Sequence, residues 1–302
     1  MSYYYKLLDW IDINKLNWDW LSGNPGAIHL LSEALEKNTD NIELIGLSMN
    51  PGAIHLISEA LEQNIDKIDW FYLSSNPGAI HLIEKNPDKI HWNGLSCNPA
   101  AIHLLEQNID KINWWHLSGN LNAIHLLEQN PDKIEWDMLS KNPGAIHLLE
   151  QNIDKIHWYL LSRNPRAIHL LEKNQDKIDW YWLSENPGAI HLLEQNPDKI
   201  EWDMLSRNPN AIHLLEKNID KIYWPWLSGN PNAIHLLEKN QDKIIDWWYL
   251  SKNPAIFTYD YDKIREHCLI FKEDIMKNRF HPRNIPKFRD WGIDGFEDYE
   301  EE

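Results

Sequence analysis

The chain has 302 residues, of which 43% are hydrophobic, and its formal net charge is −17 at pH 7. The hydrophobic content is that of a folded protein and argues against disorder over most of the chain. The negative charge argues against nucleic-acid and anionic-membrane partners, because both need clustered Lys and Arg.

Cys97 and Cys268 are far apart in sequence, so no disulfide framework is predicted and a reducing compartment is favoured. The N-terminal residues lack the apolar core of a secretion signal, and no run approaches 18 apolar residues. We therefore expect a protein that is not secreted and does not bind a membrane.

Residues 1–15 form the first predicted element, an N-terminal cap. Leu7, Leu8, Trp10 and Ile11 favour one short amphipathic turn, which would cover the first repeat. Such a cover is expected because an uncapped repeat exposes its stacking face.

Residues 16–253 are predicted to be an array of about eleven near-copies of one unit. The asparagine that starts each unit recurs at Asn24, Asn50, Asn76, Asn98, Asn120, Asn142, Asn164, Asn186, Asn208, Asn230 and Asn253. The first two steps are 26 residues, the next seven are 22 and the last is 23. The longer steps contain Ser-Glu-Ala-Leu at 32–35 and 58–61, which is close to one helical turn and of helix-forming composition.

One unit is predicted to form a pair of helices. Asn142 is a suitable N-cap, and Pro143 suits the first helical position, so a first helix of about 8–10 residues is predicted. Asn152 suits a left-handed residue that ends it. A second, shorter helix follows around Trp136 and its equivalents, which Asn17, Asp69, Asn113, Asp179 or Glu201 could cap.

The fold class predicted is therefore all-α, an α-solenoid of short helix pairs with caps at both ends. A leucine-rich-repeat-like fold is the minor alternative, because its period also fits. That motif needs a buried apolar residue where this chain has Asp137, Asp203 or Pro225. From helix spacings of ~8–10 Å, eleven stacked units would make a rod or superhelix about 100 Å long.

The pattern breaks after Ser251. Residues 254–296 are predicted to be a C-terminal helical cap, with one longer helix from Tyr261 to Lys277 and a last short helix from Ile285 to Trp291. Residues 297–302 are predicted to be an acidic, disordered tail.

The unit Asn-Pro-x-Ala-Ile-His-Leu-Leu-Glu-x-Asn-x-Asp-Lys-Ile-x-Trp-x-x-Leu-Ser resembles short repeats in proteins of giant DNA viruses of the mimivirus group. The resemblance covers about 80% of the chain, which is roughly the extent of the predicted repeat array. It implies that the protein is made in an infected host cell and lies in the host cytoplasm or in the virion. No activity can be inferred from the resemblance.

Three residues recur in nearly every unit, and we interpret each as structural. The asparagines are caps, and the tryptophans of the shorter helix are expected in the core because a large ring supplies buried area. The recurring histidines are His29, His55, His81, His103, His125, His147, His169, His191, His213 and His235. A metal stripe is the alternative for them, but neighbouring units are too far apart for one zinc, so we expect hydrogen bonds to the adjacent repeat.

Two positions of the shorter helix vary between copies. The first variable position directly follows the tryptophan, and the second lies four residues further on. The residues expected to bind a partner are Phe71, Trp115, Tyr159, Arg163, Tyr181, Glu185, Arg207 and Trp248. Neutral drift at exposed sites is the alternative, but exposed aromatic residues are typical of recognition surfaces.

No catalytic pattern is present, since the recurring Ser is unsuited to a single nucleophile and no phosphate-binding glycine loop occurs. His267, Cys268 and His281 form a loose cluster that we interpret as structural. The sequence predicts a non-enzymatic scaffold for a protein partner, without metal or cofactor. A self-associating structural component of a virion or viral assembly is the alternative.

Overall fold

The computed structural model describes residues 4–37, 44–57, 68–243, 246–274 and 277. The chain divides into two compact units, one of residues 7–257 and one of residues 1–6 with 258–302. None of the helices in the described ranges is long and apolar enough to cross a membrane. The repeat array lies in the larger unit, and it is helical as predicted.

Each repeat contains a shorter helix that begins at the recurring tryptophan, or at Leu44 in its place in α3. These helices are α1 Trp18–Ser22, α3 Leu44–Met49, α5 Trp70–Ser75, α7 Trp92–Cys97, α9 Trp114–Ser118, α11 Trp136–Ser140, α13 Trp158–Leu161, α15 Trp180–Glu185, α17 Trp202–Arg207, α19 Trp224–Leu227 and α21 Trp247–Lys252. Pro225 lies in the first turn of α19, where a helix tolerates it.

The other helix of each repeat carries the recurring histidine. These helices are α2 Ile28–Glu36, α6 Ile80–Lys85, α8 Ile102–Glu106, α10 Ile124–Gln129, α12 Ile146–Gln151, α14 Ile168–Lys173, α16 Ile190–Gln195, α18 Ile212–Lys217 and α20 Ile234–Lys239. The Ser32–Leu35 insertion lies inside α2 and lengthens it, as expected. The 58–61 insertion lies outside the described residues.

Single turns of 3-10 helix join these helices. They span Ile13–Lys15, Pro25–Ala27, Pro51–Ala53, Pro77–Ala79, Pro87–Lys89, Ile109–Lys111, Pro131–Lys133, Ile153–Lys155, Gln175–Lys177, Pro197–Lys199, Gln241–Lys243, Ile219–Lys221, Pro231–Ala233 and Pro254–Ile256. The prolines stand where the missing N–H costs no helical hydrogen bond.

With strands absent from the described part of the repeats, the leucine-rich-repeat alternative is wrong.

The helix predicted to be 8–10 residues long is shorter in most copies. Asn142 caps a turn rather than the helix itself, since its Oδ1 accepts from the backbone N–H of Gly144 at 2.9 Å. Helix α12 begins only at Ile146 and has six residues. Asn152 ends it with φ −136° and ψ 54°, so the predicted left-handed conformation is wrong. Its Nδ2 instead donates to the Leu148 carbonyl oxygen at 2.9 Å.

The recurring asparagine also joins each repeat to the one before it. Asn142 Nδ2 donates to the carbonyl oxygens of Ser118 and Asn120, at 2.9 and 3.1 Å. The asparagine is at most 3% exposed in every copy, so these hydrogen bonds are buried. One side chain therefore caps its own turn and satisfies two backbone groups of the neighbouring repeat, which explains why asparagine recurs.

The recurring serine makes a second link between repeats. Ser140 Oγ donates to the Trp136 carbonyl oxygen at 2.7 Å and accepts from the His157 N–H of the next repeat at 3.0 Å. The serine is fully buried in all the repeats, beside a leucine that is also fully buried, such as Leu139. The core thus consists mainly of leucine, isoleucine and alanine side chains, and the recurring Asn and Ser are buried with their hydrogen bonds made.

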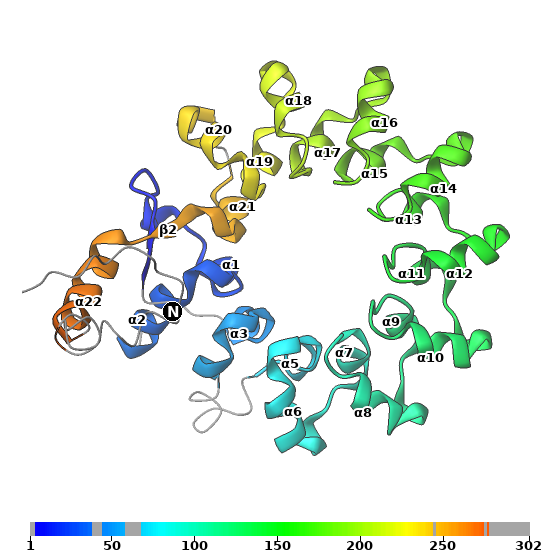
Figure 1. The fold of residues 1–302 in the computed structure, drawn as a ribbon, viewed down its shortest axis with the longest axis horizontal. Coiled ribbons are helices and arrows are strands. Elements are labelled where there is room, and N and C mark those ends of the chain that lie inside the picture. The colour runs from blue at the N-terminus through cyan, green and yellow to red at the C-terminus, as the bar shows by residue number, and fades with distance from the viewer. Residues whose placement is uncertain (1–3, 38–43, 58–67, 244–245, 275–276, 278–302) are drawn as a thin grey trace, which may run out of the picture. The chain divides into compact units, whose positions relative to one another are not determined.

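The last repeat packs against the first. Asn24 Nδ2 donates to the carbonyl oxygens of Ser251 and Asn253, at 2.9 and 3.1 Å. Asn17 N–H donates to Ser251 Oγ at 2.8 Å. Both contacts copy those between sequential repeats, so within the larger unit the array closes on itself (Figure 1). The open rod or superhelix expected from the sequence does not form.

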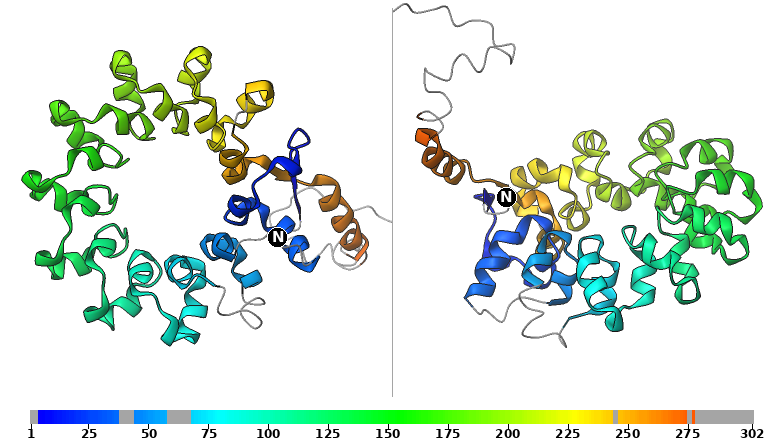
Figure 2. Two further views of the ribbon diagram at one scale, coloured as in Figure 1. Left: turned by 180° about the vertical axis from the view of Figure 1, so that it is seen from behind. Right: turned by 60° about the horizontal axis from the view of Figure 1, so that its bottom comes forward.

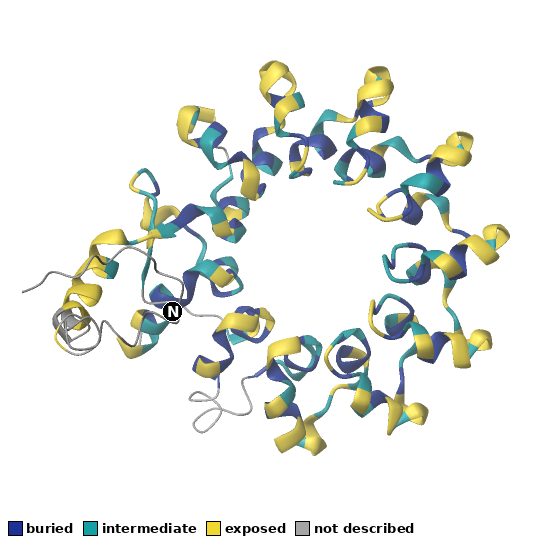
Figure 3. Cartoon of the chain, viewed as in Figure 1, coloured by how far each residue is buried: buried dark blue, intermediate teal, exposed yellow. Residues whose placement is uncertain are grey.

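The two sets of helices form two rows in this closed array. The shorter helices follow one another along the inner row and the histidine-bearing helices along the outer row, in both face views (Figures 1 and 2). Buried residues concentrate where the rows meet, and the ends of the outer helices are exposed (Figure 3). The variable residues of the shorter helices therefore belong to the inner row.

The terminal segments differ from the expected caps. A strand that was not predicted, β1 Tyr5–Leu7, pairs with β2 Phe257–Tyr259. The predicted turn follows it, since the Ile11 N–H donates to the Leu8 carbonyl oxygen at 3.0 Å. Helix α22 Tyr261–Asp274 confirms the predicted longer helix. Cys268 and Phe271 of this helix are exposed. The predicted helix at 285–291 and the tail at 297–302 lie outside the described residues.

Candidate functional site

The candidate site is the exposed surface of the shorter helices. At the first variable position Trp115, Tyr159, Tyr181 and Trp248 are 47%, 48%, 39% and 38% exposed. Aromatic residues of this size are costly to leave in water. These four residues thus have the exposure that partner binding requires.

Phe71 differs from the other expected binding residues because it is half-buried. Its ring lies edge-on to His91, with centroids 5.1 Å apart, and 6.3 Å from the ring of His116. The expectation that Phe71 is freely exposed is therefore wrong, and part of its surface stabilises the junction of neighbouring repeats.

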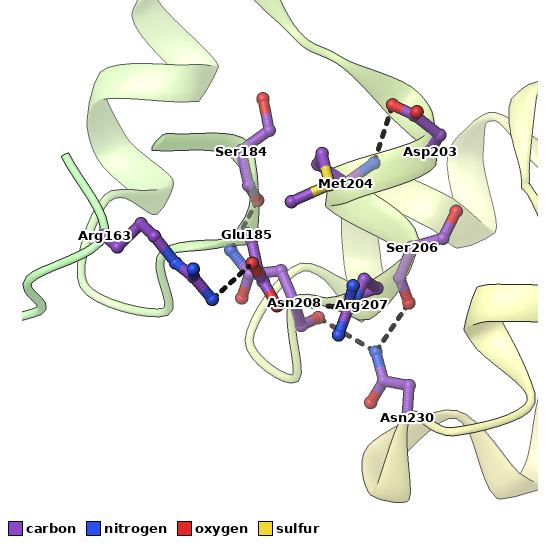
Figure 4. Close-up of polar contacts among 9 residues, drawn as sticks. All are labelled: Arg163, Ser184, Glu185, Asp203, Met204, Ser206, Arg207, Asn208 and Asn230. Carbon is purple, nitrogen blue, oxygen red and sulfur yellow. Dashed lines mark hydrogen bonds and ion pairs between the residues drawn. The ribbon is translucent and has the colours of Figure 1, made fainter. Parts of the chain in front are cut away.

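At the second variable position three expected binding residues meet. Glu185 Oε2 lies 3.4 Å from Arg163 Nη2, and Glu185 Oε1 lies 3.2 Å from Arg207 Nε. The three side chains come from successive repeats, so one carboxylate bridges two arginines (Figure 4). At this position successive repeats are therefore linked by charge as well as by the stacking of their helices.

A third variable position on the same helices was not recognised in the sequence. It lies between the other two, two residues after the tryptophan, and we call it the middle position. Its residues are Trp20, Gly46, Tyr72, Gly94, His116, Met138, Leu160, Trp182, Met204, Trp226 and Tyr249. Arg163 stacks 4.3 Å from the Trp182 ring centroid, and Arg207 lies 5.3 Å from that of Trp226. The middle position thus holds the aromatic platforms for the second variable position of the preceding repeat.

At the junction between the last and first repeats, a cation again lies over an aromatic ring of the neighbouring repeat. Lys252 Nζ lies 3.2 Å from the ring centroid of Trp20 and 3.9 Å from that of Trp248. The two indoles contact each other edge to face, with centroids 4.5 Å apart. The pKa of Lys252 is lowered by its burial and then by the charge of Arg207, while Asp246 opposes the shift.

Cys97 and His116 form a neutral polar pair on the inner row. Cys97 Sγ lies 3.2 Å from His116 Nδ1. Burial raises the pKa of the Cys97 thiol, although the charge of Lys141 acts in the opposite direction. Burial and the charge of His91 lower the pKa of His116. An activated thiolate needs the opposite shift at the cysteine, so this pair has the character of a structural contact.

The recurring tryptophans are less buried than expected. Trp224 is 9% exposed, whereas Trp92, Trp136 and Trp202 are half-buried. Each of these indoles is covered on one face by a lysine of the following repeat. The Nζ-to-centroid distances are 4.7 Å for Lys111 and Trp92, 4.6 Å for Lys155 and Trp136, and 4.5 Å for Lys221 and Trp202. The tryptophans therefore act as stacking surfaces between repeats rather than as a closed core.

Seven of the recurring histidines contact a glutamate of the neighbouring repeat, as predicted. His147 Nε2 lies 2.8 Å from Glu128 Oε1, and six further copies of this pair span 2.6–3.0 Å. Both partners are about half exposed. No group of three His, Cys, Asp or Glu side chains suited to a metal ion occurs in the part of the chain that the structure describes.

The small terminal unit contains part of the loose cluster noted in the sequence. His267 and Cys268 line a pocket together with Tyr4, Tyr5, Tyr259 and Ile264. The His267 ring contacts Tyr4, with centroids 5.6 Å apart. His281 lies outside the described residues, so the structure places two of the three cluster residues together.

The fold is that of an all-α repeat protein, and its shorter helices carry the variable residues. No family model, no curated protein and no solved structure matches the chain.

Proposed function

We propose that the chain is a non-enzymatic scaffold that binds a protein partner through the variable positions of the inner row. The observation that carries this proposal is the exposure of Trp115, Tyr159, Tyr181 and Trp248 on helices whose tryptophan, leucine and serine positions are nearly constant. Aromatic and arginine side chains dominate the binding energy of protein interfaces. The variable positions supply both, because Arg163 and Arg207 lie over Trp182 and Trp226 of the middle position.

The alternative, self-association as a structural component of a virion or viral assembly, is less well supported. Open repeat arrays associate end to end when their stacking faces are exposed. Here the Asn24 and Ser251 contacts cover those faces with each other. A partner in an infected host cell, in its cytoplasm or in the virion, fits the resemblance of the repeat to those of giant viruses.

The test is a comparison of captured proteins. The wild-type chain and a variant with Phe71, Trp115, Tyr159 and Tyr181 changed to Ala are used as baits in host and infected-cell lysates. We expect the variant to lose the partners that the wild type captures. A matched control changes Ile109, Ile153 and Ile219 to Ala, which are equally exposed at 40–41% but lie in the turns after the outer helices. Equal yields of the same partners with all three baits would contradict the proposal.

A further inference from the structure

The junction between helices α21 and α1 closes the array, and it lacks the short peptide connection that joins sequential repeats (Figure 1). It nevertheless repeats a contact of the internal junctions, since Lys15 Nζ lies 5.1 Å from the ring centroid of Trp247. Lys221 and Trp202 make the same contact at an internal junction, at 4.5 Å. Because Lys15 is exposed, this contact contributes little to holding the closing junction together.

Lys252 crosses the closing junction in the opposite direction, from the last repeat to the first. Its Nζ lies 3.2 Å from the ring centroid of Trp20, which belongs to α1. The rings of Trp248 and Tyr249, on α21 itself, have centroids 3.9 and 5.7 Å from the same nitrogen. Rings from both sides of the junction therefore approach one ammonium group, as in the aromatic cages that bind cations.

Arg163 and Arg207 occupy the same position as Lys252 at two internal junctions. Arg163 Cζ lies 4.3 Å from the Trp182 ring centroid, and Arg207 Cζ lies 5.3 Å from that of Trp226. Both guanidinium groups also pair with one carboxylate, that of Glu185. At these junctions the attraction on the cation is thus shared between an indole ring and a carboxylate.

The ammonium group of Lys252 depends on the rings instead. Lys252 forms no ion pair among the residues that the structure describes, and it is half-buried. A cation–π contact is stronger when the cation is partly removed from water than when it is exposed. Lys252 therefore contributes more to the closing junction than Lys15 does.

We propose that Lys252 is a cationic latch that keeps the array closed. Its ammonium group holds the last repeat to the first through the ring of Trp20, and Trp248 and Tyr249 complete the cage. Loss of the positive charge at this position favours an open array, in which the stacking faces of the two terminal repeats are exposed. The inference concerns closure alone and does not depend on the proposed scaffold function.

Two backbone N–H groups that cross the closing junction can report its opening by hydrogen exchange. Asn17 N–H donates to Ser251 Oγ at 2.8 Å, and Leu8 N–H donates to the Ile256 carbonyl oxygen at 2.9 Å. The internal reference is the His157 N–H, which donates to a serine Oγ across a junction that has a peptide connection. Faster exchange of the first two groups without the third measures opening of the array separately from general unfolding.

The experiment compares the full wild-type chain with Lys252→Met, which removes the charge and keeps a side chain of similar length. We expect the Asn17 and Leu8 amides to exchange about tenfold faster in Lys252→Met, because a partly desolvated cation–π contact is lost. The His157 amide should exchange at the wild-type rate. Circular dichroism checks that the variant is folded.

Two further variants separate the charge from the rest of the side chain. Lys252→Arg keeps a cation that can stack on an indole, as Arg207 does on Trp226, so its exchange should stay within about threefold of wild type. Lys15→Met removes a cation–π contact from the same junction. It should accelerate exchange less than Lys252→Met does, because Lys15 is exposed.

Wild-type exchange of Asn17 and Leu8 in folded Lys252→Met would overturn the proposal. Equal acceleration by Lys252→Met and Lys252→Arg would also overturn it, because the charge would then not be the determinant. Trp20→Leu tests the same contact from the first repeat. Adding Lys252→Met to Trp20→Leu should accelerate exchange by less than about threefold, since both changes remove one contact. A full tenfold further increase would mean that Lys252 does not act through Trp20, and the latch would be refuted.

Discussion

The side-chain amide of Asn24 donates a hydrogen bond of 2.9 Å to the backbone carbonyl oxygen of Ser251, across 227 residues of the chain. The same contact joins Asn142 to Ser118, across 24 residues, at the same distance. The junction of the first and last repeats therefore has the chemistry of an internal one. It differs in that no short peptide connection holds its two sides together.

This difference predicts unequal effects of equivalent substitutions. Asn24→Ala and Asn142→Ala each remove a cap and two buried hydrogen bonds, a loss of about 1–3 kcal/mol. Only Asn24→Ala weakens a junction without a direct chain connection, so we expect it alone to open the array. Small-angle X-ray scattering should show a larger radius of gyration for Asn24→Ala than for Asn142→Ala. An identical radius for wild type and both variants would contradict this prediction.

Much of the repeat could be predicted from the sequence because its local chemistry is distinctive. Asn142 followed by Pro143 indicates a capped turn, and Asp69 and Asn113 cap their helices as expected. Glu201 does not, since its side chain makes no capping hydrogen bond. A longer side chain must fold back to reach the same N–H groups, which explains the preference for Asp and Asn.

The closure of the array could not be predicted in this way. Curvature arises from a small rotation between successive repeats, and this rotation accumulates around the array. Asn24 has the same motif as Asn142, so nothing in the sequence marks it as the partner of the last repeat. The link between Arg163 and Glu185 is only partly predictable, because both residues are expected at the partner-binding surface but nothing in the sequence indicates their pairing across 22 residues.

The serine ladder gives a second prediction. Ser140→Ala leaves the His157 N–H without its hydrogen-bond acceptor in a site where the serine is fully buried. We expect a loss of about 1–3 kcal/mol in the free energy of unfolding. Ser75→Ala is the control, because Ser75 is half-buried and bonds only within its own helix. Urea unfolding followed by circular dichroism should show a lower midpoint for Ser140→Ala than for Ser75→Ala, and equal midpoints would refute the ladder's role.

The histidine–glutamate pairs of the outer row should contribute far less. His147 and Glu128 are each 48% exposed, and exposed ion pairs are typically worth about 0–1 kcal/mol. Glu128→Gln should therefore change the urea midpoint less than Ser140→Ala does. A larger loss for Glu128→Gln would mean that the pair organises the outer row. Raising the salt concentration should reduce even the small effect, because exposed charges are screened.

His116 predicts a dependence of stability on pH. Because burial and the charge of His91 lower its pKa below the ordinary histidine value of about 6.5, the unfolded chain binds this proton more readily than the folded chain. Stability therefore falls as pH decreases through that value and levels off below the pKa of the folded state. Protonation would also remove the ability of Nδ1 to accept a hydrogen bond from Cys97.

His116→Gln removes this titrating group, so its unfolding midpoint should fall less than that of wild type between about pH 7.5 and pH 5, the range in which histidine titrates. His103→Gln is the control, because His103 lies in the outer row beside Glu84. If wild type and His116→Gln lose the same stability over this range, then burial of His116 does not set the response to acid. If His103→Gln reproduces the effect of His116→Gln, the response belongs to histidines in general rather than to the contact between His116 and Cys97.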